Sequence, residues 1–228
     1  MDPQMLALGG LWYVAFLLSL TCHESAHALA AAWGGDYTAS SAGQVTLNPV
    51  PHITREPLGT VAVPIISFVL SQWMLGWASA PYSPIWEHRY PRRAALMALA
   101  GPAANLGLAI LAAILINLGI AAGVFTIPAS ISFFSVVEGE GDFAPVAQFV
   151  SILFTQNLLL MTFNLLPVHP LDGNSVITLA MRENTARRWF DLTRDNSFGF
   201  LGLVLAWYLF GQIFWPVLRV AIRILYWT

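Results

Sequence analysis

Four long apolar stretches constrain the fold of this chain more than any other feature. A helix needs roughly 20 mostly apolar residues to cross the hydrocarbon core of a bilayer, which is about 30 Å thick. Four segments meet this requirement and are predicted to be membrane-spanning helices: about Met5–Trp33, Arg93–Val124, Val146–Leu166 and Phe198–Trp227. Because lipid cannot satisfy exposed backbone groups, we expect an all-α polytopic membrane protein.

Composition supports this class and excludes several others. Of the 228 residues, 57% are hydrophobic and 10% are charged, whereas an ordinary soluble domain has roughly 25% charged residues. The net charge of −2 provides no basic surface for nucleic acid, and the single cysteine cannot form an intrachain disulfide. We expect one domain in the lipid bilayer, with a core at about 5–177 and a C-terminal helix at about 198–227.

Two weaker segments are expected to complete the fold. Leu58–Ala80 is long enough to cross the membrane, but Pro64, Gln72 and Gly76 interrupt it. A re-entrant or partial helix is therefore favoured there. Residues Gln44–Leu47 alternate polar and apolar side chains within a loop rich in Ser, Gly, Pro and Thr, which predicts a short β-hairpin.

Loop charges orient the predicted spans, because short arginine-rich loops tend to stay in the cytoplasm. Tyr82–Arg93 carries three arginines and Asn174–Ser197 carries four. The intervening loop, Thr126–Pro145, has three acidic residues and no arginine. Both basic loops, and the end of the third span, are therefore predicted to lie on the cytoplasmic side.

The strongest chemical signal is a pair of histidines one helical turn apart. Residues 23–27 read His-Glu-Ser-Ala-His, so His23 and His27 project from one face of the first predicted helix. Two imidazoles at this spacing can bind one metal ion, and Glu24 lies beside them. Two helix histidines bonded to carbonyls are the alternative. Burial of these groups in lipid is costly, however, unless they coordinate something or line a wet cavity.

A third metal ligand is expected from the segment that follows the third span. Zinc bound by two imidazoles needs a third protein ligand and an open position for water. Asp172 is the best candidate, because Pro167 and Pro170 break the helix and let a carboxylate turn back toward the membrane. An Asp-Gly pair is also a common turn, and that interpretation stays open.

Together these motifs resemble the site-2 protease family of intramembrane zinc metalloproteases. Three blocks match: the His-Glu-x-x-His helix, a Gly-x-x-x-Asn motif at Gly101–Asn105, and an Asn-x-x-Pro-x-x-x-Leu-Asp-Gly motif at Asn164–Gly173. The similarity covers about residues 11–177 and is greatest to compact bacterial members that lack PDZ and CBS modules. It implies hydrolysis of peptide bonds in or near the transmembrane segment of a membrane-protein substrate.

The resemblance also implies roles for individual residues. One Zn²⁺ per chain would be bound by His23, His27 and Asp172, with Glu24 as the catalytic carboxylate and Asn164 at the substrate backbone or oxyanion. The substrate would be a single-span membrane protein or a remnant peptide. The expected location is the bacterial cytoplasmic membrane, with the active site toward the cytoplasm. The oligomeric state is not indicated.

Four further residues are candidates for substrate binding or for supporting the site. Asn105 needs a partner in hydrocarbon, which a site between helices would supply, although its motif also suits close helix packing. His52 either shapes the substrate path or is a hydrogen-bonded turn residue. His169 is an alternative nitrogen ligand or a solvent-facing loop residue. Val45, in the predicted strand, could hold unwound substrate by edge pairing.

Two other functions are weighed against proteolysis. A catalytically silent scaffold that binds membrane proteins would have no need of an intact Glu24 and metal-ligand set. A metal-ion transporter would need further intramembrane carboxylates or histidines along a path, and few are present.

Overall fold

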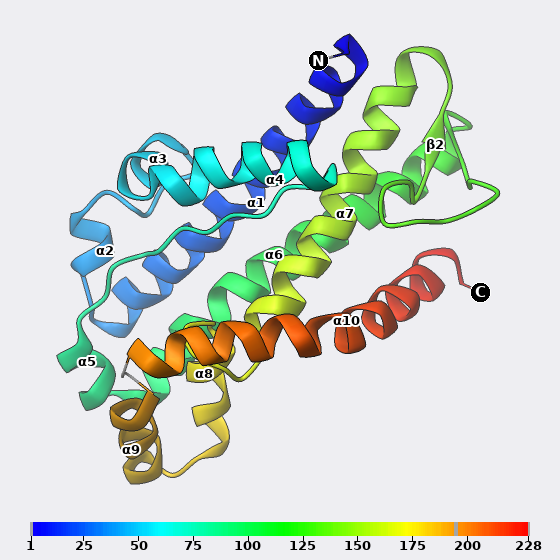
Figure 1. The fold of residues 1–228 in the computed structure, drawn as a ribbon. Coiled ribbons are helices and arrows are strands. Elements are labelled where there is room, and N and C mark those ends of the chain that lie inside the picture. Colours follow the sequence, from blue (N-terminus) through cyan, green and yellow to red (C-terminus); the bar gives the residue numbers. More distant parts are fainter. Residues whose placement is uncertain (1, 194–195, 228) are drawn as a thin grey trace.

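The computed structural model describes residues 2–193 and 196–227, and most of them are helical (Figure 1). Arg194, which belongs to the second basic loop, lies outside the described residues. The elements in chain order are α1 (Pro3–Gly34), α2 (Thr38–Ser41), α3 (Val50–Arg55), the π-helix η1 (Leu58–Ala62), α4 (Val63–Ser71), α5 (Pro84–Arg89), α6 (Pro91–Ala121), β1 (Phe125–Thr126), β2 (Glu138–Gly139), the 3₁₀ turn η2 (Gly141–Phe143), α7 (Ala144–Asn164), α8 (Gly173–Val176), the 3₁₀ turn η3 (Ile177–Ala180), α9 (Glu183–Thr193) and α10 (Asn196–Tyr226).

Four helices of the described chain are long and apolar enough to cross a membrane, namely α1, α6, α7 with η2, and α10 from Leu201. They coincide with the four predicted spans to within a few residues. Proline occupies the first turn of α1, α6 and α7, where its missing N–H removes no helical hydrogen bond. The all-α polytopic class predicted from the sequence is confirmed.

Helices α1, α6 and α7 form the centre of the bundle, and α10 packs against α7 (Figure 1). One apolar core joins α6, α7 and α10 and includes Ile116 and Phe214. A second joins α1, α4 and α7 and includes Phe16 and Ile152. The site described below lies where α6 and the chain after α7 meet the C-terminal part of α1.

The segment after α3 turns back instead of crossing the bundle. Its helical part, Leu58–Ser71, is 14 residues long, which gives about 21 Å against a hydrocarbon core of about 30 Å. The chain then runs beside α1 toward α5 (Figure 1). Gly76 packs against Phe16, and the Ser83 N–H donates a 2.7 Å hydrogen bond to Asp36, just beyond α1. This path agrees with the predicted re-entrant segment.

The two-stranded sheet forms in a different place from the one predicted. Strands β1 and β2 pair antiparallel across the acidic loop. The hairpin prediction at Gln44–Leu47 is wrong, because that segment contains no strand. Thr46 Oγ1 accepts from the Asn48 N–H, and Asn48 Oδ1 accepts from the Val50 N–H. Such local side-chain bonds favour successive turns over a sheet ladder.

Candidate metal centre

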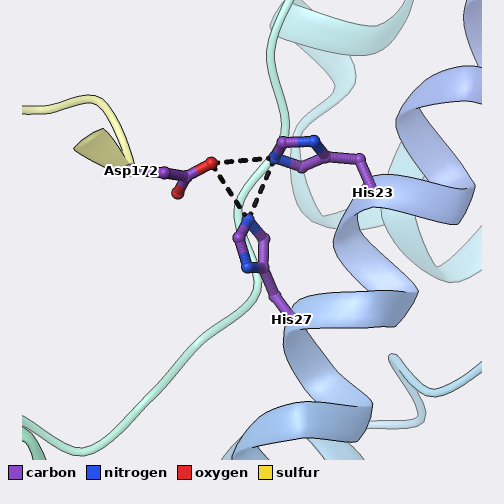
Figure 2. A group of neighbouring side chains, drawn as sticks. All are labelled: His23, His27 and Asp172. Atoms are coloured by element: carbon purple, nitrogen blue, oxygen red, sulfur yellow. Dashed lines mark hydrogen bonds and ion pairs between the residues drawn. The ribbon is translucent and has the colours of Figure 1, made fainter. Parts of the chain in front are cut away.

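Three side chains from two distant parts of the sequence meet at one point (Figure 2). His23 and His27 extend from α1, and Asp172 is the N-cap residue of α8. The two Nε2 atoms are 3.0 Å apart, and Asp172 Oδ2 lies 3.1 Å from Nε2 of His23 and 3.3 Å from Nε2 of His27. Both imidazoles are buried. Among the described residues, these three form the group that can hold a metal ion.

Hydrogen bonds on the far side of each imidazole determine which nitrogen carries the proton. His27 Nδ1 lies 2.7 Å from the carbonyl oxygen of Met97, which can only accept, so Nδ1 must donate. His23 Nδ1 lies 2.6 Å from Asn105 Oδ1, also an acceptor. In a neutral imidazole with a protonated Nδ1, Nε2 bears the lone pair. Two nitrogen lone pairs and a carboxylate oxygen therefore face one another, and a cation stabilises such a set.

The spacing of these atoms fits zinc. In a tetrahedral site with bonds of about 2.05 Å to nitrogen and oxygen, neighbouring ligand atoms are about 3.3 Å apart. The observed separations are 3.0, 3.1 and 3.3 Å. Within the described chain, the buried Oδ2 of Asp172 has no hydrogen-bond partner, and the polar atoms it faces are the Nε2 atoms of His23 and His27. The residues present thus fit a metal with three protein ligands.

Space for this cluster depends on a glycine in α6. Met97, Gly101 and Asn105 recur every four residues, so they share the face of α6 that packs on α1. A Cβ at Gly101 would lie 2.6 Å from His23 Nε2 and closer still to His27 Nε2. The sequence pattern allows both close helix packing and a supporting role at the site, and the structure shows that Gly101 leaves room for the two imidazole nitrogens.

Asp172 reaches the histidines because the chain folds back tightly after α7. A Cβ at Gly173 would overlap the carbonyl oxygen of Leu166, so this close approach requires glycine. Helix α9 stabilises this turn, because Trp189 Nε1 donates a 2.9 Å hydrogen bond to the carbonyl of Asn174. The Asp-Gly pair is therefore part of a stabilised turn between α7 and α8 that places the Asp172 carboxylate against α1.

The structure places the two predicted catalytic residues differently. Glu24 is 4% exposed and lies in the same helical turn as His23 and His27. Asn164 is the last residue of α7, and its Nδ2 donates a 3.1 Å hydrogen bond to the Leu160 carbonyl of its own helix. Glu24 is thus adjacent to the metal centre, whereas the side chain of Asn164 is bonded to its own helix.

Three other predicted residues lie apart from the triad. His52 is buried, and its Nε2 lies 3.2 Å from the carbonyl oxygen of Thr46. His169 packs beside Gly199 of α10, and burial lowers the pKa of this histidine. Val45 is exposed and lies in the loop that forms no strand. Of the four further candidates, Asn105 is the one that the structure brings to the centre, where it contacts His23.

Two polar residues behind His23 are missed by the motifs. Asn157 of α7 and Ser19 of α1 are fully buried and are hydrogen-bonded into the same network as Asn105. A polar side chain inside an otherwise apolar span is itself a signal, because such residues need internal partners.

Comparison with known proteins shows the family to which this chain belongs. Residues 11–209 match peptidase family M50. The chain belongs to this family. YwhC of Bacillus subtilis is 34% identical over 213 residues, which cover 90% of this chain and 84% of YwhC. Rip2 of Mycolicibacterium smegmatis is 30% identical over 193 residues, or 83% of this chain and 63% of Rip2. Rip2 of Mycobacterium tuberculosis is 26% identical over 225 residues, or 93% and 76%.

All of these relatives are named as zinc metalloproteases. No solved structure is significantly similar to the chain. Peptidase family M50 is the site-2 protease family that the motifs resemble, so the resemblance is confirmed. This M50 protein is an integral membrane zinc metalloprotease, and the His-His-Asp cluster is its candidate zinc site.

Proposed function

We propose that this M50 protease cleaves single-span membrane proteins or remnant peptides, in or near their transmembrane segment, with one Zn²⁺ per chain held by His23, His27 and Asp172. The observation that carries the assignment of these ligands is the convergence of their three electron-rich atoms within 3.3 Å of one another. Glu24 is the catalytic carboxylate in this proposal.

The depth of the cluster supports a substrate inside the membrane. His23 and His27 lie 11 and 7 residues before the end of α1 at Gly34, which places them about 10–16 Å from that end at 1.5 Å per residue. A transmembrane helix hides its carbonyls in its own hydrogen bonds. Substrate must therefore unwind locally near this end of the bundle before it reaches the site.

The bacterial relatives favour a bacterial cytoplasmic membrane, and the distribution of charge supports a site toward the cytoplasm. The two basic loops meet at the end of the bundle that holds the site, where Arg187 Nε of α9 donates a 3.1 Å hydrogen bond to the carbonyl of His88 in α5. The acidic loop with β1 and β2 lies at the other end (Figure 1). Because basic loops favour the cytoplasmic side, the end of the bundle that holds the site should face the cytoplasm. Arg219 and Arg223, near the end of α10, depart from this charge pattern.

The chemistry follows from the positions of the side chains. When bound, zinc polarises the scissile carbonyl and lowers the pKa of a water molecule at its open position to about 7. Glu24 takes a proton from the attacking water as the new C–O bond forms, and delivers it to the amine nitrogen as the C–N bond breaks. Because their Nδ1 protons are engaged elsewhere, His23 and His27 keep their Nε2 lone pairs directed at the centre.

The loop that precedes α3 is proposed to line the substrate path. Ser25, on the same helical turn as the centre, donates its hydroxyl to the carbonyl oxygen of Thr46. The ring of His52 contacts the same carbonyl. Leu47 of this loop is 66% exposed although it is apolar. A loop that exposes apolar side chains such as Leu47 beside the catalytic turn suits contact with an unwound transmembrane segment.

Three variants in lipid vesicles test the proposal, together with wild type and a single-span reporter substrate. Asp172→Ala should lose the zinc that elemental mass spectrometry detects in wild type at about one ion per chain. Glu24→Gln should keep zinc, because Gln removes only the proton acceptor, while cleavage falls by about 10²–10⁴-fold. Glu140→Gln, in the loop at the opposite end, is the control and should retain both. Cleavage by Glu24→Gln at the wild-type rate would contradict the assigned role.

A further inference from the structure

We propose that a directional chain of hydrogen bonds, running from α1 through α7 and α6, positions His23 as a zinc ligand. Asn157 and Ser19 are then positioning residues of the site, although neither lies next to the metal centre. This inference rests on the proposed function, since it takes His23 as a ligand. Its residues come from three different membrane-spanning helices.

The chain of contacts is continuous. Asn105 Oδ1 lies 2.6 Å from His23 Nδ1, and Asn105 Nδ2 donates to Asn157 Oδ1 at 2.8 Å. Asn157 Nδ2 donates to Ser19 Oγ at 2.9 Å. Ser19 Oγ donates to the carbonyl of Ala15 at 2.7 Å. Ser19, Asn105 and Asn157 have no exposed surface, so bulk water offers no alternative partners.

The direction of every bond is determined by backbone carbonyls, which can only accept. Ser19 directs its hydrogen to a carbonyl, so its oxygen is left to accept from Asn157 Nδ2. The same Nδ2 also donates to the Leu153 carbonyl at 2.8 Å. With its amino group engaged in this way, Asn157 presents Oδ1 to Asn105.

Asn105 is oriented in turn. Its Nδ2 donates to Asn157 Oδ1 and to the Ser19 carbonyl oxygen at 3.3 Å. Its Oδ1 therefore faces His23 and requires a proton on Nδ1, which leaves the Nε2 lone pair for the metal. Rotating either amide by 180° would set donors against donors and acceptors against acceptors, and would leave buried polar atoms without partners.

The two histidine ligands differ in this respect. His27 Nδ1 donates to the backbone carbonyl of Met97, which cannot reverse its polarity. His23 Nδ1 instead meets a side-chain amide, whose oxygen and nitrogen exchange places on rotation. The tautomer of His23 thus depends on the residues behind Asn105, whereas that of His27 does not. In the part of the chain that the structure describes, the buried side-chain network accordingly extends from His23 and not from His27.

The test compares Asn157→Leu with Thr155→Val in the purified full-length protein. Thr155 is as deeply buried in the same helix, but its hydroxyl bonds within α7 and not to the network. Zinc affinity is measured by competition with a chelating dye, and the absorption spectrum of the cobalt(II)-loaded protein reports the ligand geometry. Asn157→Leu should weaken zinc binding by about 10–100-fold and alter the cobalt bands, as loss of an outer partner of a metal ligand does. Thr155→Val should match wild type.

The outcomes separate this inference from the proposed function. If wild type binds no zinc, the proposed function fails. If wild type binds zinc and Asn157→Leu binds it equally well, with the same cobalt spectrum, the positioning role is refuted. Should Asn157→Leu not fold, Ser19→Ala decides, because it removes only the hydroxyl that accepts from Asn157. Weaker zinc binding by Ser19→Ala supports the positioning role of the hydrogen-bond chain, and unchanged zinc binding overturns it.

Discussion

Replacing Gly101 by alanine should abolish the metal centre without unfolding the bundle. The new Cβ would lie 2.6 Å from His23 Nε2, whereas ordinary contacts begin at 3.4 Å. The His23 ring must therefore retreat by about 0.8 Å, and His27 by more, whereas metal-ligand distances tolerate only about 0.2 Å. We expect zinc affinity to fall by at least about 100-fold, beyond the range for outer-partner mutations.

Gly107→Ala is the matched control for this prediction. Gly107 lies in the same helix, and a Cβ there meets nothing within 4 Å. Alanine is also the better helix former by roughly 1 kcal/mol in both variants. Elemental mass spectrometry of the two proteins in detergent, with circular dichroism to establish equal helix content, makes the comparison. If Gly101→Ala binds zinc as tightly as Gly107→Ala, a Cβ at position 101 does not displace the imidazoles, and this prediction is refuted.

Two other features give predictions away from the metal. Burial raises the pKa of Asp36, but hydrogen bonds from Thr38 and Ser83 outweigh it and hold this pKa below its ordinary 3.8. The bonds thus stabilise the fold above about pH 4 and lose effect as the pH falls further. The unfolding temperature of wild type should drop in acid more than that of Asp36→Asn; parallel curves would contradict this. A Cβ at Gly202 would overlap a carbonyl of the α7–α8 loop, whereas Gly211 has open space. Gly202→Ala should therefore destabilise the protein by about 1–3 kcal/mol in thermal unfolding, and Gly211→Ala is the control. Equal unfolding temperatures for Gly202→Ala and Gly211→Ala would count against this prediction.

Much of the fold and the centre of the site follow from the sequence for physical reasons. Span length and apolar composition must match the bilayer, so the four long helices are predictable to within a few residues. The spacing of His23 and His27 places both rings on one helix face whatever the surroundings. The prolines before Asp172 indicate that the chain turns back toward the membrane there. These features can be predicted because each depends on residues within one segment of the chain.

What the sequence could not predict depends on contacts between segments. The alternation at Gln44–Leu47 is typical of a strand, but Thr46 forms local bonds and its carbonyl accepts from Ser25 of α1. The register of α6 against α1, which brings Gly101 to the imidazoles, is set by packing over the whole helix. Asn157 acquires its partners only when three helices come together.

The convergence of Asp172 on α1 also bears on how the folded chain resists unfolding. His27 and Asp172 are separated by 145 residues, so a metal ion that binds both closes a loop of more than half the protein. For a permanent cross-link around a loop of this length, the lost entropy of the unfolded chain corresponds to about 5 kcal/mol. In the proposed zinc site, the ion would therefore stabilise the folded chain by linking α1 to the segment after α7. Removing such an ion with a chelator should therefore lower the unfolding temperature as well as abolish cleavage.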